Sequence, residues 1–366
     1  MKRFLILAAG ILLFSSHALA QQRVIDATDN TPVSAASIFD ASGNMAGITG
    51  SDGTITGIPE SAYPITIRCI GYEQLVIEQA EEKTWEMIPA AYELEEVVVV
   101  PAERNVLKQI FYVREYFSMC NSTDTTTFFI EHMADRFVAA SKKAKFNGSS
   151  SLRILDSHQY SRYKIDGKDS LASSDESDFP SMLTILGDLN DKEIRAPQSF
   201  KEGESTVKLH EIPGICGMSV IQKQNDYTFT TIVDGLADEE EHKISPFALK
   251  VFGLGMEIYQ LYCTQAYNIN DEGVYLPCDL TEASFVMEAN GTGKLLRKIF
   301  SSSSPVTIRS MVEMYIVDRD YLTKDEAKKQ SKIKPSDVKF VIPSSVPPLN
   351  EATRKMVEMA KNKVGH

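Results

Sequence analysis

The chain is 366 residues long, enough for about two domains of the usual 100–200 residues, and its hydrophobic content of 43% excludes a disordered or low-complexity protein. It carries 38 Lys and Arg against 50 Asp and Glu, a formal net charge of −12. This excess of negative charge argues against a nucleic-acid partner and against an anionic membrane surface, because both require a surplus of cations.

The first twenty residues have the pattern of a cleaved signal peptide. Lys2 and Arg3 form a short cationic start, residues 4–14 form an uninterrupted apolar run, and an Ala-Leu-Ala tripeptide ends at Ala20. An apolar run of eleven residues is too short to cross a bilayer, which takes about 20 residues. We therefore predict cleavage between Ala20 and Gln21, export of the chain, no transmembrane span, and a mature net charge of about −14 from 36 cations and 50 anions.

Residues 21–100 have the pattern of a β-sandwich. The Asp52-Gly53 dipeptide is typical of a tight hairpin turn, because glycine adopts the positive φ that such turns require. Short, closely spaced strands separated by Asp/Gly turns predict an antiparallel sandwich. We expect strands at 24–26, 33–39, 45–49, 55–58, 65–70, 75–79, 85–88 and 97–100.

Four motifs in this segment resemble, in their order along the chain, the carboxypeptidase-like regulatory domain: VIDATDNTPVSAASI, GITGSDGTI, ITIRCIGYE and LEEVVVV. The resemblance implies a seven-stranded, transthyretin-like β-sandwich. Such domains occur beside zinc carboxypeptidases and ahead of the plug of TonB-dependent outer-membrane receptors in the Bacteroidota-type cell envelope, which implies a location in the periplasm or at the outer membrane. Arg23 and Ile55 replace the Gly and Phe common in the family, and both differences concern packing or a turn.

The last of these motifs suggests a docking edge. In the receptors the equivalent stretch leads to the plug, so an exposed strand of Val97, Val98, Val99 and Val100 could pair with a partner by β-strand addition. The alternative is that this strand completes the sandwich of its own chain.

The polar residues of the other motifs have structural explanations. Asp26, Asp29 and Asp52 are expected to cap turns through their side-chain oxygens, a role far more frequent than calcium binding. Gly71 is expected to allow a sharp turn, and Tyr72 to bury its ring while its hydroxyl stays in water.

From Pro101 onward we predict a larger β-rich (α+β) domain, residues 101–342, followed by a C-terminal helical tail, residues 343–366. Pro101 interrupts the valine run and so marks the boundary. The segments 106–117 and 126–140 are compatible with either strands or helices, because aromatic and β-forming residues share them with helical spacing.

The later part of this domain gives clearer signals. A capping box at Thr323 and Glu326 predicts a short helix through Lys329, and Asn350 is expected to cap a final helix over 351–362. We expect extended segments at 206–212, 227–233, 285–289 and 306–316, and a hairpin turn at 290–293 leading into 294–300.

Residues 105–330 are similar to an uncharacterised partner domain that follows regulatory domains in some exported envelope proteins. The motifs YVREYF and YIVDRDYLTKDEAKK carry this similarity. It implies a β-rich domain with an open, curved sheet and no known chemistry.

The chain has five cysteines, too few and too widely spaced for a disulfide scaffold or a zinc finger. If Asn268 pairs with Gly273 in a hairpin, Cys263 lies opposite Cys278 and a cross-strand disulfide is feasible. The alternative is a pair of small buried thiols.

The sequence shows no recognisable catalytic, cofactor or metal site. A zinc carboxypeptidase needs His-x-x-Glu, whereas only His132 is followed at that spacing by a carboxylate, that of Asp135. The G-x-S-x-G motif of serine hydrolases is absent. We therefore predict no catalytic, cofactor-binding or metal-binding residue.

The function we predict is that of a non-enzymatic, exported envelope protein. Its sandwich would act as a binding or interaction module for another envelope protein or a carbohydrate. One alternative is a hydrolase of unrecognised type in 105–340, which a pocket with His132 or His158 beside a carboxylate would favour. Another is binding of an apolar ligand, which an open sheet with an apolar concave face would favour.

Overall fold

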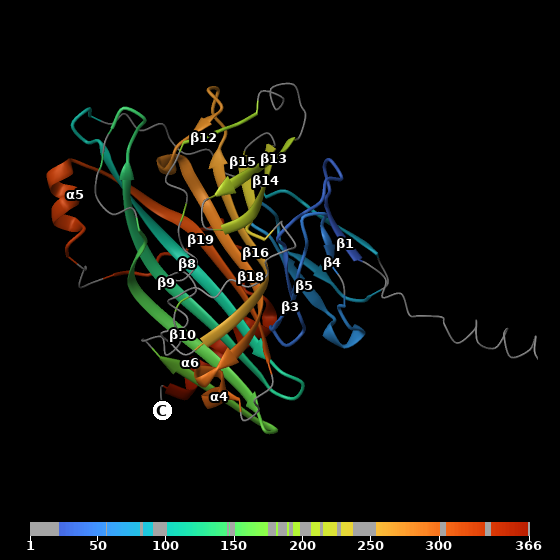
Figure 1. Ribbon diagram of the computed structural model, residues 1–366. Helices are drawn as coiled ribbons and strands as arrows, with labels where there is room; N and C mark the ends of the chain where they lie inside the picture. The colour runs from blue at the N-terminus through green and yellow to red at the C-terminus, as the bar shows by residue number, and fades with distance from the viewer. Residues whose placement is uncertain are drawn as a thin grey trace, which may run out of the picture.

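The protein is mostly β in the part of the chain that the computed structural model describes (Figure 1). A sandwich near the N-terminus, one large curved sheet and three α-helices make up this part. The predicted signal peptide with its cleavage site at Ala20 and Gln21, and the predicted edge Val97–Val100, lie outside it. The described residues are 22–55, 57–80, 83–90, 101–144, 146, 151–174, 181, 189, 193–197, 206–212, 215–224, 228–236, 254–300, 305–333 and 338–364.

Among the described residues the sandwich has seven strands in two sheets, with the orders β4-β1-β7 and β3-β2-β5-β6. β1 pairs with β7 in parallel, which corrects the expectation of a wholly antiparallel sandwich. Parallel pairing is open to these two strands because most of the sandwich, rather than a tight hairpin, connects them. The strands are β1 (Gln22–Asp26), β2 (Ser37–Phe39), β3 (Met45–Ile48), β4 (Thr54–Ile55), β5 (Ile65–Arg68), β6 (Leu75–Ile77) and β7 (Thr84–Met87), with a 3-10 turn at Glu60–Ala62.

The two sheets close on an apolar core. Trp85 of β7 is 1% exposed and belongs to the same buried cluster as Ile65 and Ile67 of β5. Because side chains alternate along a strand, Arg68 lies on the opposite face of β5 from these two isoleucines. The sandwich therefore presents a buried arginine away from its own core and toward the large sheet.

The predicted turn-capping aspartates are confirmed. The Oδ1 atoms of Asp26, Asp29 and Asp52 each accept the backbone N–H two residues further on, at 2.8–2.9 Å. Gly53 has a φ of +74°, and a Cβ there would lie 2.5 Å from the carbonyl oxygen of Val24. The Asp-Gly turn thus needs glycine both for its backbone conformation and for its close approach to β1.

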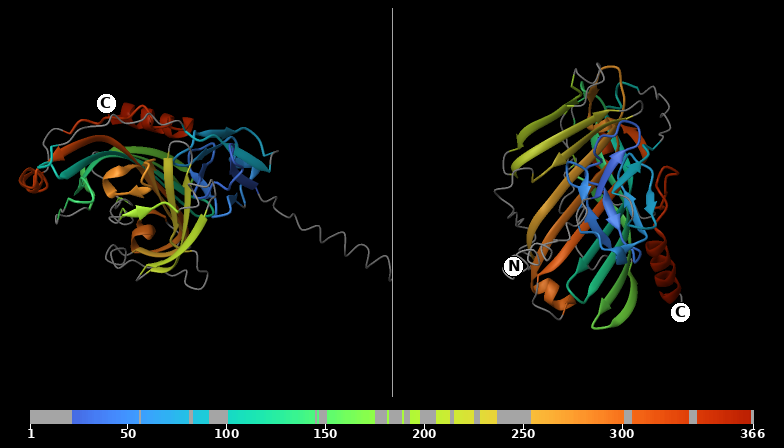
Figure 2. Two further views of the ribbon diagram at one scale, coloured as in Figure 1. Left: turned by 90° about the horizontal axis from the view of Figure 1, so that it is seen from above. Right: turned by 90° about the vertical axis from the view of Figure 1, so that its right-hand side faces the viewer.

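The second unit is one ten-stranded antiparallel sheet with the order β11-β10-β9-β8-β19-β18-β16-β15-β14-β13. Within the described residues its end strands β11 and β13 have a neighbour on one side only, and the sheet curves strongly (Figure 2). Its strands are β8 (Val106–Cys120), β9 (Thr125–Ala139), β10 (Arg153–Ile165), β11 (Lys168–Ser174), β13 (Thr206–Ile212), β14 (Ile215–Gln224), β15 (Thr228–Asp234), β16 (Leu254–Asn268), β18 (Leu280–Gly293) and β19 (Val306–Leu322).

The segments 106–117 and 126–140, whose sequence was compatible with strand or helix, are strands. Both faces of β8 and β9 are buried, so neither shows the alternation of apolar and polar residues that marks a half-exposed strand. Phe111 lies in a cluster with Phe285 on the concave face, and Tyr116 lies in a different cluster on the convex face.

The chain itself covers the concave face in the part that is described. The small ribbon of β12 (Ile194–Arg195) and β17 (Val274–Tyr275) brings Tyr275 onto Phe229, with ring centroids 4.2 Å apart. The buried apolar side chains of this face are at most 8% exposed. Binding of an apolar ligand would need an exposed apolar concave face. The described residues of this face are buried and do not form such a surface.

The hairpin turn predicted at residues 290–293 is wrong, because a strand occupies these residues and a helix follows it. β18 continues through residues 290–293 with β16 and β19 on either side, and α4 (Lys294–Ile299) follows directly. Leu296 and Phe300 are 3% and 0% exposed and pack into the concave cluster. Phe300 is the C-cap residue of α4, and its backbone N–H donates to the carbonyl of Leu296 at 2.8 Å. The helical turn between the two residues lets both side chains pack into the same cluster, which explains why this segment is helical.

The two predicted capped helices are confirmed as α5 (Lys324–Gln330) and α6 (Glu351–Val364). In the capping box the backbone N–H of Thr323 donates to Glu326 Oε2 at 2.8 Å. At the start of α6, Asn350 Oδ1 accepts the backbone N–H of Thr353 at 2.8 Å.

Of the two alternatives for Cys263 and Cys278, the structure has the thiols and not the cross-strand disulfide. Both thiols are free, and Cys263 lies opposite Phe285 in the sheet. The prediction assumed a simple hairpin, whereas the connection contains β17 and a 3-10 helix at Pro277–Asp279 before the ladder resumes. Cys278 lies in that 3-10 helix and is not on the paired strand at all.

Candidate functional site

The sandwich and α6 pack on the convex face of the large sheet (Figure 2). Phe39 of β2 meets Tyr116 of β8 edge to face, with ring centroids 5.1 Å apart, and Met356 of α6 belongs to the same buried cluster. The backbone N–H of Met45 donates to Ser118 Oγ at 3.0 Å. The junction is thus a continuous core rather than a flexible contact.

A buried ion pair lies at the centre of this junction. Arg68 Nη2 is 2.7 Å from Glu313 Oε2 of β19, and the two side chains are 1% and 2% exposed. Arg68 Nη1 also donates to the hydroxyl of Tyr116 at 2.7 Å. Burial alone would lower the pKa of Arg68, but the Glu313 carboxylate together with Tyr116 and Tyr315 outweighs burial and raises that pKa, so the arginine stays charged.

Two cavities lie on either side of the loop 69–72 that follows Arg68. Both are lined by Cys69, Ile70, Gly71 and Tyr72. Gly71 has a φ of +85°, the left-handed conformation that lets the chain reverse direction here. This confirms the predicted sharp turn and makes the loop a wall shared by the two cavities.

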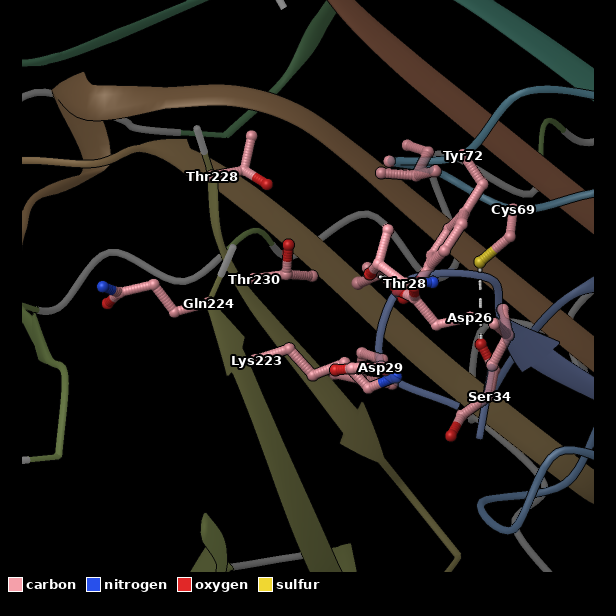
Figure 3. A pocket seen from close by; sticks show the side chains of 15 residues that line it. Asp26, Thr28, Asp29, Ser34, Cys69, Tyr72, Lys223, Gln224, Thr228 and Thr230 are labelled. Carbon is pink, nitrogen blue, oxygen red and sulfur yellow. Dashed lines mark hydrogen bonds between the residues drawn. The ribbon is translucent and has the colours of Figure 1, made fainter. Parts of the chain in front are cut away.

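The smaller one, which we call the turn cavity, lies between the first turn of the sandwich and strands β14 and β15 (Figure 3). Its volume is about 50 Å³, room for a few water molecules at about 15 Å³ each. Lys223 of β14 reaches into it and donates to Thr31 Oγ1 at 3.0 Å and to the carbonyl of Pro32. Burial lowers the pKa of Lys223, and the nearby Asp29 and Asp26 partly offset that shift.

The acidic groups of the turn cavity are already bound by the protein. The Tyr72 hydroxyl donates to Asp26 Oδ2 at 2.8 Å, which corrects the expectation that it stays in water. Burial alone would raise the pKa of Asp26, but hydrogen bonds from Thr28 and Tyr72 outweigh it and hold that pKa below its usual value. The residues around this small cavity bind one another and so connect the sandwich to the sheet. Because its charged groups already have partners, the cavity is poorly suited to a ligand.

The larger one, which we call the junction cavity, has a volume of about 380 Å³, within the range of about 300–1,000 Å³ typical of ligand pockets. Distant parts of the chain form it: the loop 69–74, Ala90, residues Glu282 and Tyr315 of the large sheet, and the segment 344–348. It therefore exists only when sandwich, sheet and C-terminal segment are assembled.

The polar groups of the junction cavity are mainly acceptors and hydroxyls. Glu282 is 6% exposed, and Tyr315 is 3% exposed with its pKa raised by burial and then by the neighbouring Glu313. The Oε1 atom of Gln74 is buried and has no hydrogen-bond partner. A buried acceptor without a donor is costly, so a donor from a ligand would improve this site.

His132 and His158, the two histidines that would favour a hydrolase if a carboxylate lay beside them, lie on opposite faces of the large sheet. His158 stacks on Phe340 on the convex side, with ring centroids 4.4 Å apart. His132 Nε2 is 3.0 Å from Glu115 Oε1, and His132 Nδ1 is 2.6 Å from Ser157 Oγ. A carboxylate thus lies within hydrogen-bond reach of His132.

Two negative findings apply to the described part of the chain. No group of three or more His, Cys, Asp or Glu side chains there is placed to hold a metal ion. No helix there is long and apolar enough to cross a membrane.

Comparisons with known proteins identify no family for this chain. No family model and no curated protein matches it. A solved structure described as lipid–protein interactions in lipovitellin is similar at a TM-score of 0.31 and 9% identity, over 60% of this chain and 26% of that one. The chain thus spans about a quarter of the length of that structure, and a likeness this low carries no argument about function.

Proposed function

We propose that the protein is an exported envelope protein that binds a carbohydrate in the junction cavity. The observation that carries this proposal is a cavity of about 380 Å³ whose lining includes Gln74, the Oε1 of which is buried and unpartnered. The predicted signal peptide and the resemblance to the carboxypeptidase-like regulatory domain support the envelope location.

The chemistry of the cavity favours a ligand rich in hydroxyl groups. Gln74 Oε1 and the Glu282 carboxylate are acceptors, so they suit a ligand that donates hydrogen bonds. Ile70, Val346 and Pro347 add apolar surface to the same walls. Sugars combine donating hydroxyls with apolar C–H faces and so match both features.

The test is calorimetric titration with a panel of neutral hexoses and N-acetylhexosamines. Gln74→Leu keeps the size of the side chain and removes the unpartnered acceptor. A sugar that binds the wild type is expected to bind this variant about fivefold more weakly, because one hydrogen bond is worth about 1 kcal/mol.

Gln79→Leu is the matched control, because Gln79 is an exposed residue of the same sandwich outside the cavity lining. This variant is expected to bind like the wild type. If no sugar of the panel binds at millimolar concentration, or if both variants bind equally well, the proposal is wrong.

A further inference from the structure

A second polar cluster lies in the large sheet, away from the junction. Glu115 of β8, His132 of β9 and Ser157 of β10 project from three adjacent strands on the concave face. Ser157 Oγ is 2.6 Å from His132 Nδ1, and His132 Nε2 is 3.0 Å from Glu115 Oε1. The three groups form one continuous chain of hydrogen bonds.

The hydrogen bonds fix which nitrogen of His132 can act as a base. A carboxylate only accepts hydrogen bonds, so Glu115 requires a proton on Nε2. The Ser181 hydroxyl also donates to Glu115 and helps to hold that carboxylate in place. In the neutral imidazole Nδ1 is then unprotonated, and its lone pair faces the hydroxyl of Ser157.

Of the three residues, Ser157 is the most exposed to solvent. The Glu115 and His132 side chains are 2% and 1% exposed, whereas Ser157 is partly exposed. β11 pairs with β10 only from Gln159 onward, so within the described residues Ser157 lies where β10 has no outer neighbour. A substrate could approach along this free edge.

A β-bulge lies beside Ser157 in β10. The register between β10 and β9 shifts between Ile154 and Asp156, which places an extra residue, Leu155, in β10. Bulges are over-represented at sheet edges and next to active sites, where they redirect a side chain. Here the bulge lies two residues before Ser157, which the restored register sets directly opposite His132.

We propose that Ser157 and His132 form the nucleophile and general base of an acyl-transfer site, with Glu115 as the positioning residue. The substrate class is a neutral ester, because Ile130 and Ala134 flank His132 on the same face. Ser157 Oγ attacks the ester carbonyl as its proton moves to His132 Nδ1. The C–O bond to the alcohol breaks, the alcohol leaves with that proton, and water releases the acyl group from Ser157 in the reverse sequence.

The test uses a fluorophosphonate probe on the intact protein, because such a probe forms a bond from Ser Oγ to phosphorus and releases fluoride and a proton. Mass spectrometry is expected to find the phosphonyl group on Ser157. Ser157→Ala should lose the label, and His132→Gln should label at least about a hundredfold more slowly.

The control is Ser161→Ala, because Ser161 is a buried serine on the same strand and face outside the chain of hydrogen bonds. It should label like the wild type. Glu115→Gln should still label at Ser157, with the rate profile moved toward acid pH, since the imidazolium loses its anionic partner. Absence of the label from Ser157 in the wild type, or an unchanged rate in a folded His132→Gln variant, overturns the proposal.

Discussion

Replacement of Arg68 by methionine should show how firmly the sandwich is joined to the large sheet. Methionine has a similar length but no charge, so the variant leaves the Glu313 carboxylate 2% exposed and without its ion-pair partner. Removing one member of a fully buried pair costs about 3–5 kcal/mol. The lost hydrogen bond from Arg68 to Tyr116 belongs to the same loss.

A double variant separates the cost of the unpaired charge from the value of the pair. In Arg68→Met with Glu313→Leu neither charge of the pair is left, so the cost of burying these two ions disappears together with the ion pair. Exchange of a buried pair for apolar residues is often neutral or stabilising by about 1–4 kcal/mol. The double variant is therefore expected to be at least as stable as the wild type.

The assay is urea unfolding at neutral pH, followed by tryptophan fluorescence. Trp85 is the single tryptophan of the chain and is 1% exposed in the sandwich core, so its signal reports the sandwich itself. Arg354→Met is the control, because the Arg354–Glu358 pair is exposed and such a pair is worth about 0.5 kcal/mol. A loss no larger than that of the control, or a double variant as unstable as Arg68→Met, would refute this reasoning.

Three further results are expected. Asn350→Ala should cost about 1 kcal/mol in urea unfolding because it removes the cap of α6, whereas Asn362→Ala on an exposed position of α6 should stay within about 0.5 kcal/mol; equal losses would contradict the cap. In urea without reductant, iodoacetamide should modify both Cys263 and Cys278. If the two cysteines react only after treatment with a reductant, they form a disulfide and the expectation is wrong. Because Asp26 has a folded-state pKa below its unfolded value, it stabilises the fold above about pH 4 and loses that effect as the pH falls through the folded pKa. Asp26→Asn should therefore lose less stability than the wild type between about pH 5 and pH 3 in urea titrations at each pH, and equal losses would show that the carboxylate is not the cause.

Local signals in the sequence predicted local structure well. Turn-forming aspartates, the Asp52-Gly53 dipeptide and the caps at Thr323 and Asn350 act through atoms a few residues apart, so the residue types alone determine the contact. The errors have a different physical origin. Leu296 becomes helical because of a core it meets only after folding, and β17 moves the strand that was expected to carry Cys278.

The candidate sites could not be predicted from local signals, because their residues meet only after folding. The junction cavity joins the loop 69–74 to Glu282, Tyr315 and the segment 344–348, and nothing in one sequence indicates that these parts meet. The sequence indicates that His132 beside a carboxylate would favour a hydrolase, but the partners of His132 come from the two adjacent strands. The pairing register brings Ser157 and Glu115 to it, and register is a property of the assembled sheet.

The parallel pairing of β1 and β7 has a mechanical consequence. Four register pairs join the two strands, from Arg23 with Thr84 to Asp26 with Met87. Tension applied at the start of β1 and at the end of β7 would pull the strands past each other and load these hydrogen bonds together, whereas antiparallel neighbours pulled from one end open one bond at a time. A chain held at its N-terminal end while its large sheet is pulled would thus resist extension at the very strands where its sandwich closes.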